Sequence, residues 1–375
     1  MKVLHIYKDY YPPVIGGIEK HINLLAHGLE ERGIEVNVLV SNTGTKLERE
    51  KINGISVTKA PQLGRFASAP LNITFPFLLR ELGKKVDILH FHFPNPTGEL
   101  SYLLSGLEHK PVVSYHSDII RQVNLLKLYG PFLMKFLEKT EIILVSSYNY
   151  LNSSKWLMRF RNKCKVIPYG HKLPALEFYP ETNRKIAALH QRYGSFILLF
   201  VGRFRNYKGL HILIESMKKV KGKLLLIGAG PLGKTLRRQV AGAKLDKKVF
   251  FLGELPDQEM VLHLHACDIL ILPSHLRSEA FGFVQLEAMA CGKPVISTEL
   301  KTGTSFVNQN RKTGLVIRPN DVQALAEAIN YLLANPEIRE NYGKAGVERV
   351  EKYFAMEKMV DNIIEVYESI LRGQP

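Results

Sequence analysis

The feature that most constrains the fold of this chain is a repeated succession of a short apolar run, a turn rich in glycine or proline, and a longer amphipathic segment. The first example comprises the apolar run 3–7, the turn at Gly16 and Gly17, and the amphipathic segment 18–31. Apolar runs of this length predict buried strands, and a 3.6-residue apolar period predicts helices. Strands that alternate with helices indicate α/β units built on parallel sheets.

Two such series follow each other along the 375 residues, a length that suits two or three domains. The first series occupies residues 1–170 and the second residues 196–355, and a polar stretch between them predicts an interdomain linker at 171–195. The final segment, 356–375, predicts a helix that closes the chain. The expected fold class is therefore α/β, with two Rossmann-like domains that face each other across a central cleft.

The stretch 278–296 carries the strongest chemical signal of the second series. It follows an apolar run, has the period of a short helix, and ends where the next strand begins. Ala280, Phe281, Gly282 and Phe283 are thereby predicted to form the amino-terminal end of a helix at the carboxyl edge of a parallel sheet. Unpaired backbone N–H groups and the helix dipole favour an anion at such a position, most often a phosphate.

Two carboxylates frame that predicted helix end. Glu279 lies in the loop before it, and Glu287 lies about 7.5 Å further along the axis at roughly 1.5 Å per residue. Because a phosphate repels carboxylates, a ligand bound here must also offer hydrogen-bond donors, and sugar hydroxyls are strong donors to an ionised carboxylate. A nucleotide sugar is a ligand of this kind, because its phosphates lie between the hydroxyls of the ribose and those of the sugar. The alternative is an ordinary amphipathic helix with two solvated glutamates, and the residues alone leave both open.

Two loops that follow strands of the second series add cations and glycines. Arg203 and Lys208 stand where a diphosphate can bind, although a solvated basic loop explains these two residues equally well. Gly228 and Gly230 satisfy the G-x-G-x-x-G spacing of dinucleotide-dependent oxidoreductases. Pro231 stands where the helix of that motif should open, so we interpret the glycines as a place of close backbone approach to a nucleotide.

Histidines mark two strands of the first series. His116 directly follows the predicted strand 112–115, and a lone histidine in such a position is more often structural than functional. His90 and His92 alternate, so both side chains point to the same face of their strand. They could be mistaken for metal ligands, but no acidic residue or third histidine lies near them in the sequence, and we predict no metal site.

The net charge of +16 predicts an anionic partner. Residues 119–165 hold nine Lys or Arg and two Glu, interleaved with apolar residues. A core-facing helix with a solvated basic face explains this span, and docking on an anionic membrane surface is the sharper alternative. Nucleic acid fits less well because the aromatic residues lack a stacking pattern, and we expect no nucleic-acid partner.

Targeting and redox signals favour a cytoplasmic protein, peripheral on the inner face of the cell membrane if the span 119–165 docks there. No apolar run approaches the roughly 18 residues that span a bilayer, and the apolar part of residues 1–7 is too short for a signal peptide. The three cysteines are widely spaced, which argues against a disulfide framework or a zinc site and favours a reducing compartment.

The segment 278–296, with Glu279 and Glu287 separated by seven residues, resembles the E-x7-E signature of retaining GT-B glycosyltransferases of family GT4, also called glycosyltransferase group 1. Gly-Arg followed by Lys-Gly in 202–209 resembles the family loop that neutralises the pyrophosphate of the donor. The Gly-x-Gly-Pro turn at 228–231 resembles a turn that lines the donor cleft in this family.

The first series carries the resemblance as well. Gly16 and Gly17 resemble the GT4 loop that approaches the transferred sugar and the acceptor, and His116 matches the family histidine that contacts the donor sugar. The segments 114–122 and 301–308 resemble those of bacterial O-antigen and exopolysaccharide mannosyltransferases. The resemblance covers nearly the whole chain.

The resemblance implies a GT-B fold in which residues 1–170 bind the acceptor, residues 196–355 bind the nucleotide sugar, and the C-terminal helix at 356–375 crosses back to pack on the first domain. The implied activity is retaining transfer of a sugar, with mannose as the candidate, from a nucleoside-diphosphate sugar to a glycan or lipid-linked acceptor. This reaction belongs to the synthesis of cell-surface polysaccharide, such as lipopolysaccharide.

In the implied mechanism Arg203 and Lys208 carry the diphosphate, Glu279 holds hydroxyls of the donor sugar and Glu287 holds the ribose, and His116 completes the catalytic set with Glu279, Lys208 and Arg203. No cofactor is expected, and a divalent metal need not be essential because Arg203 and Lys208 already neutralise the diphosphate. A nucleotide-sugar epimerase or hydrolase of the same fold stays an alternative, and a dinucleotide-dependent oxidoreductase is the alternative from another class.

Overall fold

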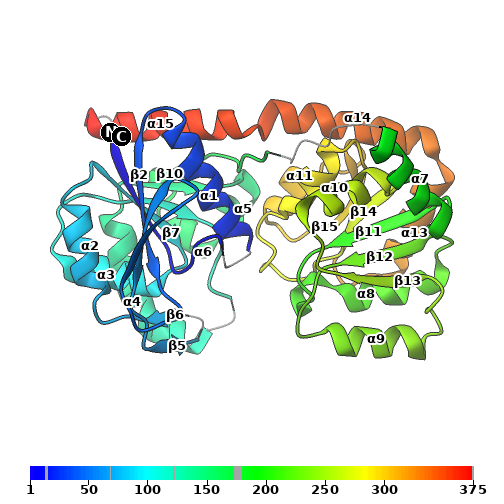
Figure 1. The fold of residues 1–375 in the computed structure, drawn as a ribbon, viewed down its shortest axis with the longest axis horizontal. Coiled ribbons are helices and arrows are strands. Elements are labelled where there is room, and N and C mark those ends of the chain that lie inside the picture. Colours follow the sequence, from blue (N-terminus) through cyan, green and yellow to red (C-terminus); the bar gives the residue numbers. More distant parts are fainter. Residues whose placement is uncertain (13–15, 68, 121–122, 173–179, 374–375) are drawn as a thin grey trace. The chain divides into compact units, whose positions relative to one another are not determined.

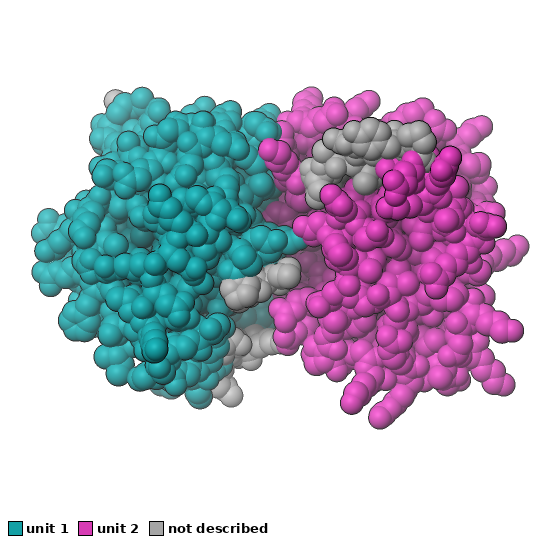
Figure 2. Space-filling model, viewed as in Figure 1, with its two compact units in different colours: residues 1–170, 356–375 teal, residues 171–355 magenta. Residues whose placement is uncertain are grey.

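The structure is a computed structural model, and it describes residues 1–12, 16–67, 69–120, 123–172 and 180–373. It divides into two compact units (Figure 2). Unit 1 contains Met1–Gly170 and Met356–Pro375, and unit 2 contains His171–Ala355. The chain therefore leaves unit 1 once and returns to it at its C-terminus.

Unit 1 is built on an eight-stranded sheet in the order β10-β9-β8-β7-β1-β2-β4-β3 (Figure 1). All neighbouring strands are parallel except β3 and β4, which form a hairpin. An Asn-Gly pair such as Asn53-Gly54 predicts a hairpin turn, and this prediction is confirmed: both residues have positive φ, 50° and 92°. The strands are β1 (Lys2–Ile6), β2 (Glu35–Ser41), β3 (Glu48–Ile52), β4 (Ile55–Ala60), β7 (Ile88–Phe93), β8 (Val112–Tyr115), β9 (Ile142–Val145) and β10 (Cys164–Val166).

Helices cover both faces of the unit 1 sheet. On one face α1 (Gly17–Glu30) and α15 (Met356–Leu371) contact each other and pack on Val3, Tyr7 and Val38. On the other face Phe91 lies edge-on to aromatic rings of α3 and α4. The remaining elements of unit 1 are the hairpin β5 (Gly64–Phe66) and β6 (Ala69–Leu71), the helices α2 (Phe75–Gly83), α3 (Pro96–Ser105), α4 (Val123–Lys139), α5 (Tyr148–Ser153) and α6 (Lys155–Arg159), and the 3₁₀ turn η1 (Arg161–Lys163).

Unit 2 is built on a six-stranded, wholly parallel sheet in the order β13-β12-β11-β14-β15-β16. Counted from β11, this is the 3-2-1-4-5-6 order of the Rossmann fold, which reverses between β11 and β14. The predicted α/β class with two Rossmann-like units is confirmed. The strands are β11 (Ile197–Val201), β12 (Lys223–Ile227), β13 (Val249–Gly253), β14 (Ile269–Leu272), β15 (Val295–Thr298) and β16 (Gly314–Ile317).

The unit 2 sheet also lies between two layers of helices. Leu213 of α8, Leu236 of α9 and Ile329 of α13 pack in one apolar cluster with the sheet. α7, α10, α11 and α14 form a second contacting set. The elements are α7 (Pro180–Tyr193), α8 (Leu210–Ser216), α9 (Gly233–Gly242), α10 (Asp257–Ala266), α11 (Phe283–Ala290), α12 (Gly303–Val307), α13 (Val322–Ala334), α14 (Pro336–Tyr353), η2 (Asn206–Lys208) and η3 (Met217–Lys219).

The linker predicted at 171–195 requires correction. Residues 180–193 of this segment form α7, which contacts α10 and belongs to unit 2, whereas residues 173–179 lie outside the described residues. α7 presents a narrow apolar stripe with Ile186 and Leu189 half-buried and Tyr193 buried, and most of its other residues are exposed. A helix that buries so narrow a stripe has a polar composition, which is why the sequence suggested a linker.

The amphipathic pattern of residues 148–160 predicts a single helix, but the structure divides this segment into α5 and α6. The side chain of Ser154 accepts a hydrogen bond from the backbone N–H of Leu157 and caps α6. Serine at this position competes with the continuing helix for backbone hydrogen bonds, and this explains the break.

Candidate active site

The strand order of unit 2 places two loops next to each other. β11 and β14 are parallel neighbours, so the loops that follow them, 202–209 and 273–282, leave the same edge of the sheet. In open α/β sheets ligands bind beyond the carboxyl ends of the strands, at the point where the strand order reverses. Lys208 comes from the first loop and Glu279 from the second.

Lys208 and Glu279 form a buried ion pair. Lys208 Nζ lies 2.6 Å from Glu279 Oε2, and the two side chains are 11% and 8% exposed. Ser274 Oγ donates a second hydrogen bond to the same Oε2 at 2.8 Å. Burial acts to lower the pKa of Lys208, but the attraction of Glu279 outweighs it, and the pKa lies above the ordinary lysine value. The structure thus brings a predicted cation and a predicted carboxylate into direct contact.

A second pair of contacts holds the two loops together. Gly209 has a φ of 70°, and a Cβ atom there would lie 2.0 Å from the carbonyl oxygen of Pro273, so only glycine permits this approach. The backbone N–H of His275 donates to the carbonyl of Tyr207 at 2.9 Å, and the His275 ring nitrogen Nε2 lies 2.8 Å from the carbonyl oxygen of Asn206. These contacts fix Lys208 close to the loop that carries Glu279.

The loop around Glu279 is anchored from its other side by the segment that follows β15. Thr302 Oγ1 donates to the carbonyl of Glu279 at 2.8 Å, and the N–H of Gly303 donates to the carbonyl of Ala280 at 2.7 Å. A Cβ atom at Gly303 would lie 2.6 Å from the Phe281 ring. The position of Glu279 is therefore set by backbone contacts as well as by its ion pair.

The helix predicted to begin within 280–283 starts at Phe283, the last of these residues. Gly282 caps α11 in the left-handed conformation, with φ 79°, while Phe281 is buried and Ala280 lies half-buried in the preceding bend. Gln285 Nε2 donates to the carbonyl of Phe281 at 3.0 Å and fixes the bend. The amino end of α11 therefore lies directly behind the ion-pair loop.

Glu287 lies one turn further along α11. Its side chain is 13% exposed, and its Oε1 lies 3.9 Å from Nε2 of His171, the first residue of unit 2. The Glu287 carboxylate also acts to raise the pKa of Lys208, which places it within electrostatic reach of the ion pair. Lys208, Glu279 and Glu287 thus gather in one region, and His171 is a neighbour that the sequence did not suggest.

Arg203 lies in the same loop as Lys208 but differs in its surroundings. It is exposed to solvent. Within the part of the chain that the structure describes, no ion pair joins Arg203 to Glu279. Its predicted contact with a diphosphate stays a prediction.

Gly228 and Gly230 allow the backbones of two loops of the protein to lie close together. A Cβ atom at Gly228, which has a φ of 126°, would lie 2.2 Å from the carbonyl oxygen of Gly202. A Cβ atom at Gly230 would lie 2.7 Å from both the backbone nitrogen and the carbonyl oxygen of Phe204. The glycines therefore let the loop after β12 pack on the loop that carries Arg203 and Lys208, which accounts for the motif without a dinucleotide.

In unit 1, Gly16 caps α1 and Gly17 is its first residue. A Cβ atom at Gly16 would lie 2.1 Å from Oε2 of Glu19, so this buried carboxylate lies over the amino end of α1, where the helix dipole favours it. Residues 13–15 of the predicted loop lie outside the described residues. The sugar contacts implied for Gly16, Gly17 and His116 stay predictions.

His116 belongs to a layer of buried histidines, which corrects the expectation that His90 and His92 lack a third histidine nearby. His5 and His116 lie close to them because pairing of β1, β7 and β8 brings together residues far apart in the sequence, and His21 reaches them from α1. Burial lowers the pKa of His5 and of His21 to about 3. Burial also holds the pKa values of the other three well below the ordinary value, and these are His90, His92 and His116.

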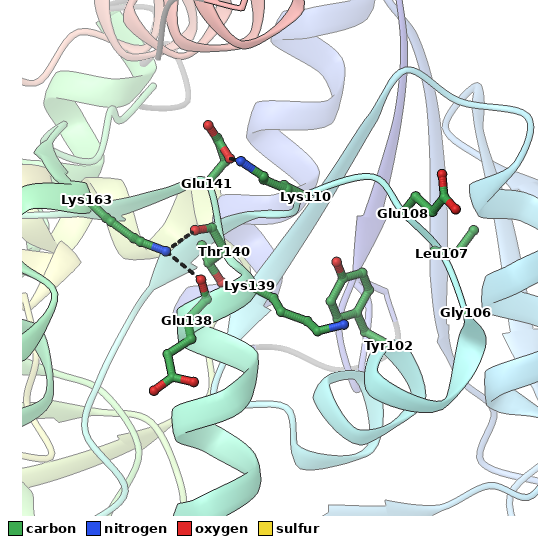
Figure 3. Close-up of a pocket in the computed structure, with 10 residues that line it drawn as sticks. All are labelled: Tyr102, Gly106, Leu107, Glu108, Lys110, Glu138, Lys139, Thr140, Glu141 and Lys163. Atoms are coloured by element: carbon green, nitrogen blue, oxygen red, sulfur yellow. Dashed lines mark hydrogen bonds and ion pairs between the residues drawn. The ribbon is translucent and has the colours of Figure 1, made fainter.

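A surface pocket of unit 1, of about 570 Å³, lies away from these residues (Figure 3). It lies at the amino ends of β8 and β9, the edge opposite to the one from which ligand loops leave. Lys163 Nζ donates to the carbonyls of Glu138 and Thr140 at 2.6 and 2.8 Å, and Lys110 pairs with Glu141 at 2.9 Å (Figure 3). No predicted site residue is among the ten described residues that line it.

Two family models match this chain, one in each unit. The model described as Glycosyltransferase Family 4 matches residues 15–173, and the model described as Glycosyl transferases group 1 matches residues 182–349. Solved structures agree on the fold. Sucrose-phosphate synthase from Thermosynechococcus elongatus superposes with a TM-score of 0.82 at 24% identity over 99% of both chains. Anabaena HepE in complex with UDP-glucose gives 0.78 at 21% over 98% of this chain and 100% of that chain.

Curated relatives extend over the whole length. The O-antigen chain mannosyltransferase C of Escherichia coli is 36% identical over 374 residues, covering 100% of both chains. The D-rhamnosyltransferase WbpZ of Pseudomonas aeruginosa is 37% identical over 94% of this chain and 92% of its own. These matches overturn the dinucleotide-oxidoreductase alternative. The chain therefore has a GT-B fold and belongs to glycosyltransferase family 4, and it is a glycosyltransferase.

Proposed function

We propose that this enzyme transfers a sugar, with mannose as the candidate, from a nucleoside-diphosphate sugar to a glycan or lipid-linked acceptor, with retention of configuration. The observation that carries the proposal is the Lys208–Glu279 ion pair at the point where the strand order of unit 2 reverses. The names of the two relatives, an O-antigen mannosyltransferase and a D-rhamnosyltransferase, support a role in cell-surface polysaccharide synthesis. The HepE complex with UDP-glucose supports a nucleotide-sugar donor.

Lys208 can serve Glu279 and a diphosphate together, because an ammonium group has three donors. One of them is used by Glu279 Oε2. As the bond from the sugar to the diphosphate breaks, negative charge grows on the leaving oxygen, and a fixed cation stabilises that transition state more than the ground state. Arg203, exposed in the same loop, supplies the second positive charge.

Glu279 has a second role at the donor sugar. Lys208 and Ser274 both contact its Oε2, and we assign Oε1 to the hydroxyls of the sugar. Glu287 is assigned to the ribose. The departing phosphate oxygen accepts the proton of the acceptor hydroxyl on the same face of the sugar, so the proposal needs no protein nucleophile and no cofactor.

Ligand binding is tested first with thermal-shift measurements on GDP-mannose, UDP-glucose, UDP-GlcNAc and the free nucleotides. A ligand that binds the native state at 100 times its Kd adds about 2.7 kcal/mol of stability and raises the melting temperature. The matching nucleotide sugar should raise it in the wild type and much less in Lys208→Ala. If none of the donors shifts the wild type, the proposed donor class is wrong.

Product analysis separates transfer from the epimerase or hydrolase alternative. The enzyme is incubated with its donor with and without a lipid-linked acceptor. Transfer predicts a glycosylated acceptor of retained anomeric configuration and little free sugar when the acceptor is absent. Rapid release of free sugar, or of an epimerised donor, without an acceptor would favour the alternative.

A membrane surface is the proposed location of the acceptor, and α4 carries the observation that favours it. One side of α4 packs into the core through Leu133 and Phe136. On its exposed side Leu128 and Phe132, 76% and 51% exposed, alternate with Lys127, Lys135 and Lys139. Apolar and basic residues on one exposed face suit an anionic bilayer, which adds about 1 kcal/mol per basic residue. None of the described helices is long and apolar enough to cross a membrane.

Co-sedimentation with anionic liposomes at low and physiological salt tests this docking. The wild type should pellet at both, and Lys135→Glu with Lys139→Glu should weaken binding, whereas Lys247→Glu on the exposed surface of unit 2 should not. No pelleting at either salt would end the membrane proposal and leave the donor proposal intact.

A further inference from the structure

Large apolar side chains that are exposed to solvent gather in one short stretch of unit 1. Five of them lie within residues 63–77, with exposed fractions between 51% and 73%, and these are Leu63, Phe66, Leu71, Ile73 and Phe77. The whole described part of unit 2 exposes four, which are Phe196, Leu276, Tyr331 and Tyr353. Single exposed apolar residues are ordinary, but a group of them marks an interaction surface.

The register of the hairpin β5–β6 separates its two faces. Residues directly opposite each other in an antiparallel pair point to the same face, and the face alternates along each strand. Arg65 is opposite Pro70, and these two share the inner face, where Pro70 is buried. Phe66 and Leu71 lie on the other face, and both are exposed. The hairpin therefore turns an apolar face to solvent.

The inner face is tied to the carboxyl edge of the unit 1 sheet. Arg65 pairs with Asp9, which follows β1, and Arg65 Nη1 donates to Asp9 Oδ2 at 3.2 Å. Thr97 Oγ1, in the first turn of α3, donates to a backbone carbonyl of β6. Asn72 Nδ2 donates at 3.2 Å to the carbonyl of Ala60, the last residue of β4. A hairpin of two strands is marginally stable by itself, so these contacts hold it in place.

The carboxyl edge is also the side of the unit 1 sheet on which the acceptor is expected. The loop after β1 leads to Gly16 and Gly17, which resemble the family loop that approaches the acceptor, and His116 follows β8. β1, β4, β7 and β8 are parallel, so these loops leave the edge to which the hairpin is tied. Figure 1 shows β5 and β6 at the end of unit 1 that lies away from α15. An apolar surface at this edge suits an acceptor that is carried by a lipid.

α3 connects the hairpin with the basic helix α4. It contacts both β6 and α4, and its Leu104 side chain is 76% exposed. The exposed side of α4 carries Leu128 and Phe132 between lysines. Residues 63–77 contain no Asp or Glu, so no side chain of this stretch repels an anionic headgroup. The hairpin and α4 thus offer a bilayer two different groups, apolar side chains and positive charges.

We propose that the outer face of the β5–β6 hairpin, with the neighbouring residues Ile73 and Phe77, inserts into the acyl-chain region of the membrane that carries the acceptor. This inference rests on the proposed membrane location of the acceptor and adds a second contact of a different kind. Salt screens the attraction between the lysines of α4 and lipid phosphates. Salt does not screen the burial of phenyl and aliphatic groups among acyl chains, so the hairpin accounts for binding that persists at high salt.

A second copy of this chain is the competing partner for the exposed apolar face. Each copy carries a net charge of +16, and like charges oppose association of two copies. An anionic bilayer attracts the same positive charge. The charge of the chain therefore favours the bilayer, and the oligomeric state without lipid tests the second copy.

The first test measures binding to vesicles of phosphatidylcholine and phosphatidylglycerol at physiological salt and at about 1 M salt, where the Debye length is about 3 Å. Phe66→Gln with Leu71→Gln keeps the net charge and changes only exposed side chains, so this hairpin variant should fold as the wild type does. Its binding at physiological salt should fall about tenfold or more, and its binding at high salt should be lost. Phe196→Gln with Tyr331→Gln, on exposed side chains of unit 2, should match the wild type.

The second test locates residue 66 in the bilayer. Phe66→Trp is combined with Trp156→Phe, which removes the only natural tryptophan of the chain. On vesicles the emission of the new tryptophan should shift to shorter wavelength, and lipids brominated on their acyl chains should quench it. Tyr331→Trp, again combined with Trp156→Phe, should show neither effect.

Unchanged vesicle binding of the hairpin variant, or absence of quenching at position 66, would overturn the proposed insertion. Sedimentation without lipid tests the competing partner. A dimeric wild type together with a monomeric hairpin variant would assign the face to a second copy and overturn the insertion as well. Donor-induced thermal shifts should be equal in the wild type and the hairpin variant. Failure of the insertion and failure of the donor proposal are therefore seen in different measurements.

Discussion

Units 1 and 2 share a strand order and differ in the chemistry at the point where that order reverses. In unit 2 the reversal lies between β11 and β14, and the loops beyond it carry the Lys208–Glu279 ion pair. In unit 1 the series β4-β2-β1-β7-β8-β9 repeats the order, and the reversal lies between β1 and β7, whose register partners are His5 and His90. One unit thus holds buried charges in loops, and the other holds buried neutral rings within its strands.

The comparison shows that the strand order determines where a site can form. The side chains at that place determine which ligand can bind and how much stability is lost when they are replaced. An ion pair leaves an uncompensated charge when one partner is removed, so its loss is expensive. A neutral hydrogen-bonded ring costs less to lose but responds sharply to protonation. Unit 2 should therefore be most sensitive to removal of one partner of its ion pair, and unit 1 to a fall in pH.

The largest expected effect is that of Lys208→Ala in unit 2. Turnover at saturating donor should fall about 10²–10³-fold, because a fixed positive charge at the leaving oxygen is lost. The free energy of unfolding should fall by about 3–5 kcal/mol, because Glu279 stays buried without its partner. Initial rates and denaturant titrations measure the two effects.

A double variant distinguishes the two roles of this lysine. Lys208→Met combined with Glu279→Leu removes both charges, so it should recover much of the stability and stay inactive. Lys247→Ala, at an exposed position of unit 2, should change neither quantity. A double variant that regains turnover would show that the pair is structural only.

The second effect is a loss of stability at acid pH, and the buried histidines of unit 1 cause it. In the unfolded chain a histidine takes up a proton near pH 6.5, but burial depresses the pKa of His5 and His21 to about 3 in the folded protein. The unfolded state therefore binds more protons below pH 6.5, and stability falls as the pH falls. Each of the five histidines contributes up to about 1 kcal/mol between pH 6.5 and 5.5, measured by denaturant titration.

The buried carboxyl group of Glu99 stabilises the protein as the pH falls, so its contribution must be subtracted from the loss that the histidines cause. Burial raises its pKa to about 8, so between pH 8 and its unfolded value the folded state holds the extra proton and stability grows as the pH falls. Five histidines outweigh one glutamate, and the net loss of stability between pH 6.5 and 5.5 should be up to about 4 kcal/mol. His90→Asn should reduce the slope with pH, whereas the exposed His109→Asn should not. A flat profile between pH 7 and 5 would contradict the neutral histidine layer.

A third and smaller effect concerns the glycine-rich turn of unit 2. Gly228→Ala should destabilise the protein by about 2 kcal/mol, because its φ of 126° is strained for alanine and the new Cβ meets the carbonyl of Gly202. Gly242→Ala, at the end of α9 with open space around it, is the control and should be neutral or slightly stabilising. Equal melting temperatures for the two variants would contradict the packing role of Gly228.

The elements that the sequence predicts well are those whose signal is local. The strand at 112–115, the helix at 356–371 and the turn at Asn53-Gly54 each carry their period or turn chemistry within a few residues. The E-x7-E segment likewise predicts that Glu279 lies in a loop just before a helix. α7 was missed because its apolar stripe is narrow, and the capping role of Ser154 because one serine resembles any other in a polar stretch.

The candidate sites depend on contacts that no local pattern contains. Lys208 and Glu279 are 71 residues apart, and only the neighbouring positions of β11 and β14 bring them together. The histidine layer is a stronger case, because His5 and His92 meet only once the register of β1 and β7 is known. A sequence shows which residues stand at strand ends, but strand order decides which of them become neighbours.

The smallest effect compares one hydroxyl in each unit. Ser274 donates to the ionised carboxylate of Glu279 at 2.8 Å, and the Tyr367 hydroxyl lies 2.5 Å from Nδ1 of the neutral ring of His90. Hydrogen bonds to a charged group are roughly twice as strong as neutral ones, so Ser274→Ala should cost about 2 kcal/mol and Tyr367→Phe about 1 kcal/mol. Tyr148→Phe, on an exposed ring of unit 1, is the control for Tyr367. Denaturant titration at pH 7.5 measures all three. If Tyr367→Phe lowers the free energy of unfolding more than Ser274→Ala does, the hydrogen bonds of the histidine layer stabilise one another and do not act independently. The difference between a charged site in unit 2 and a neutral one in unit 1 would then not explain the stability effects.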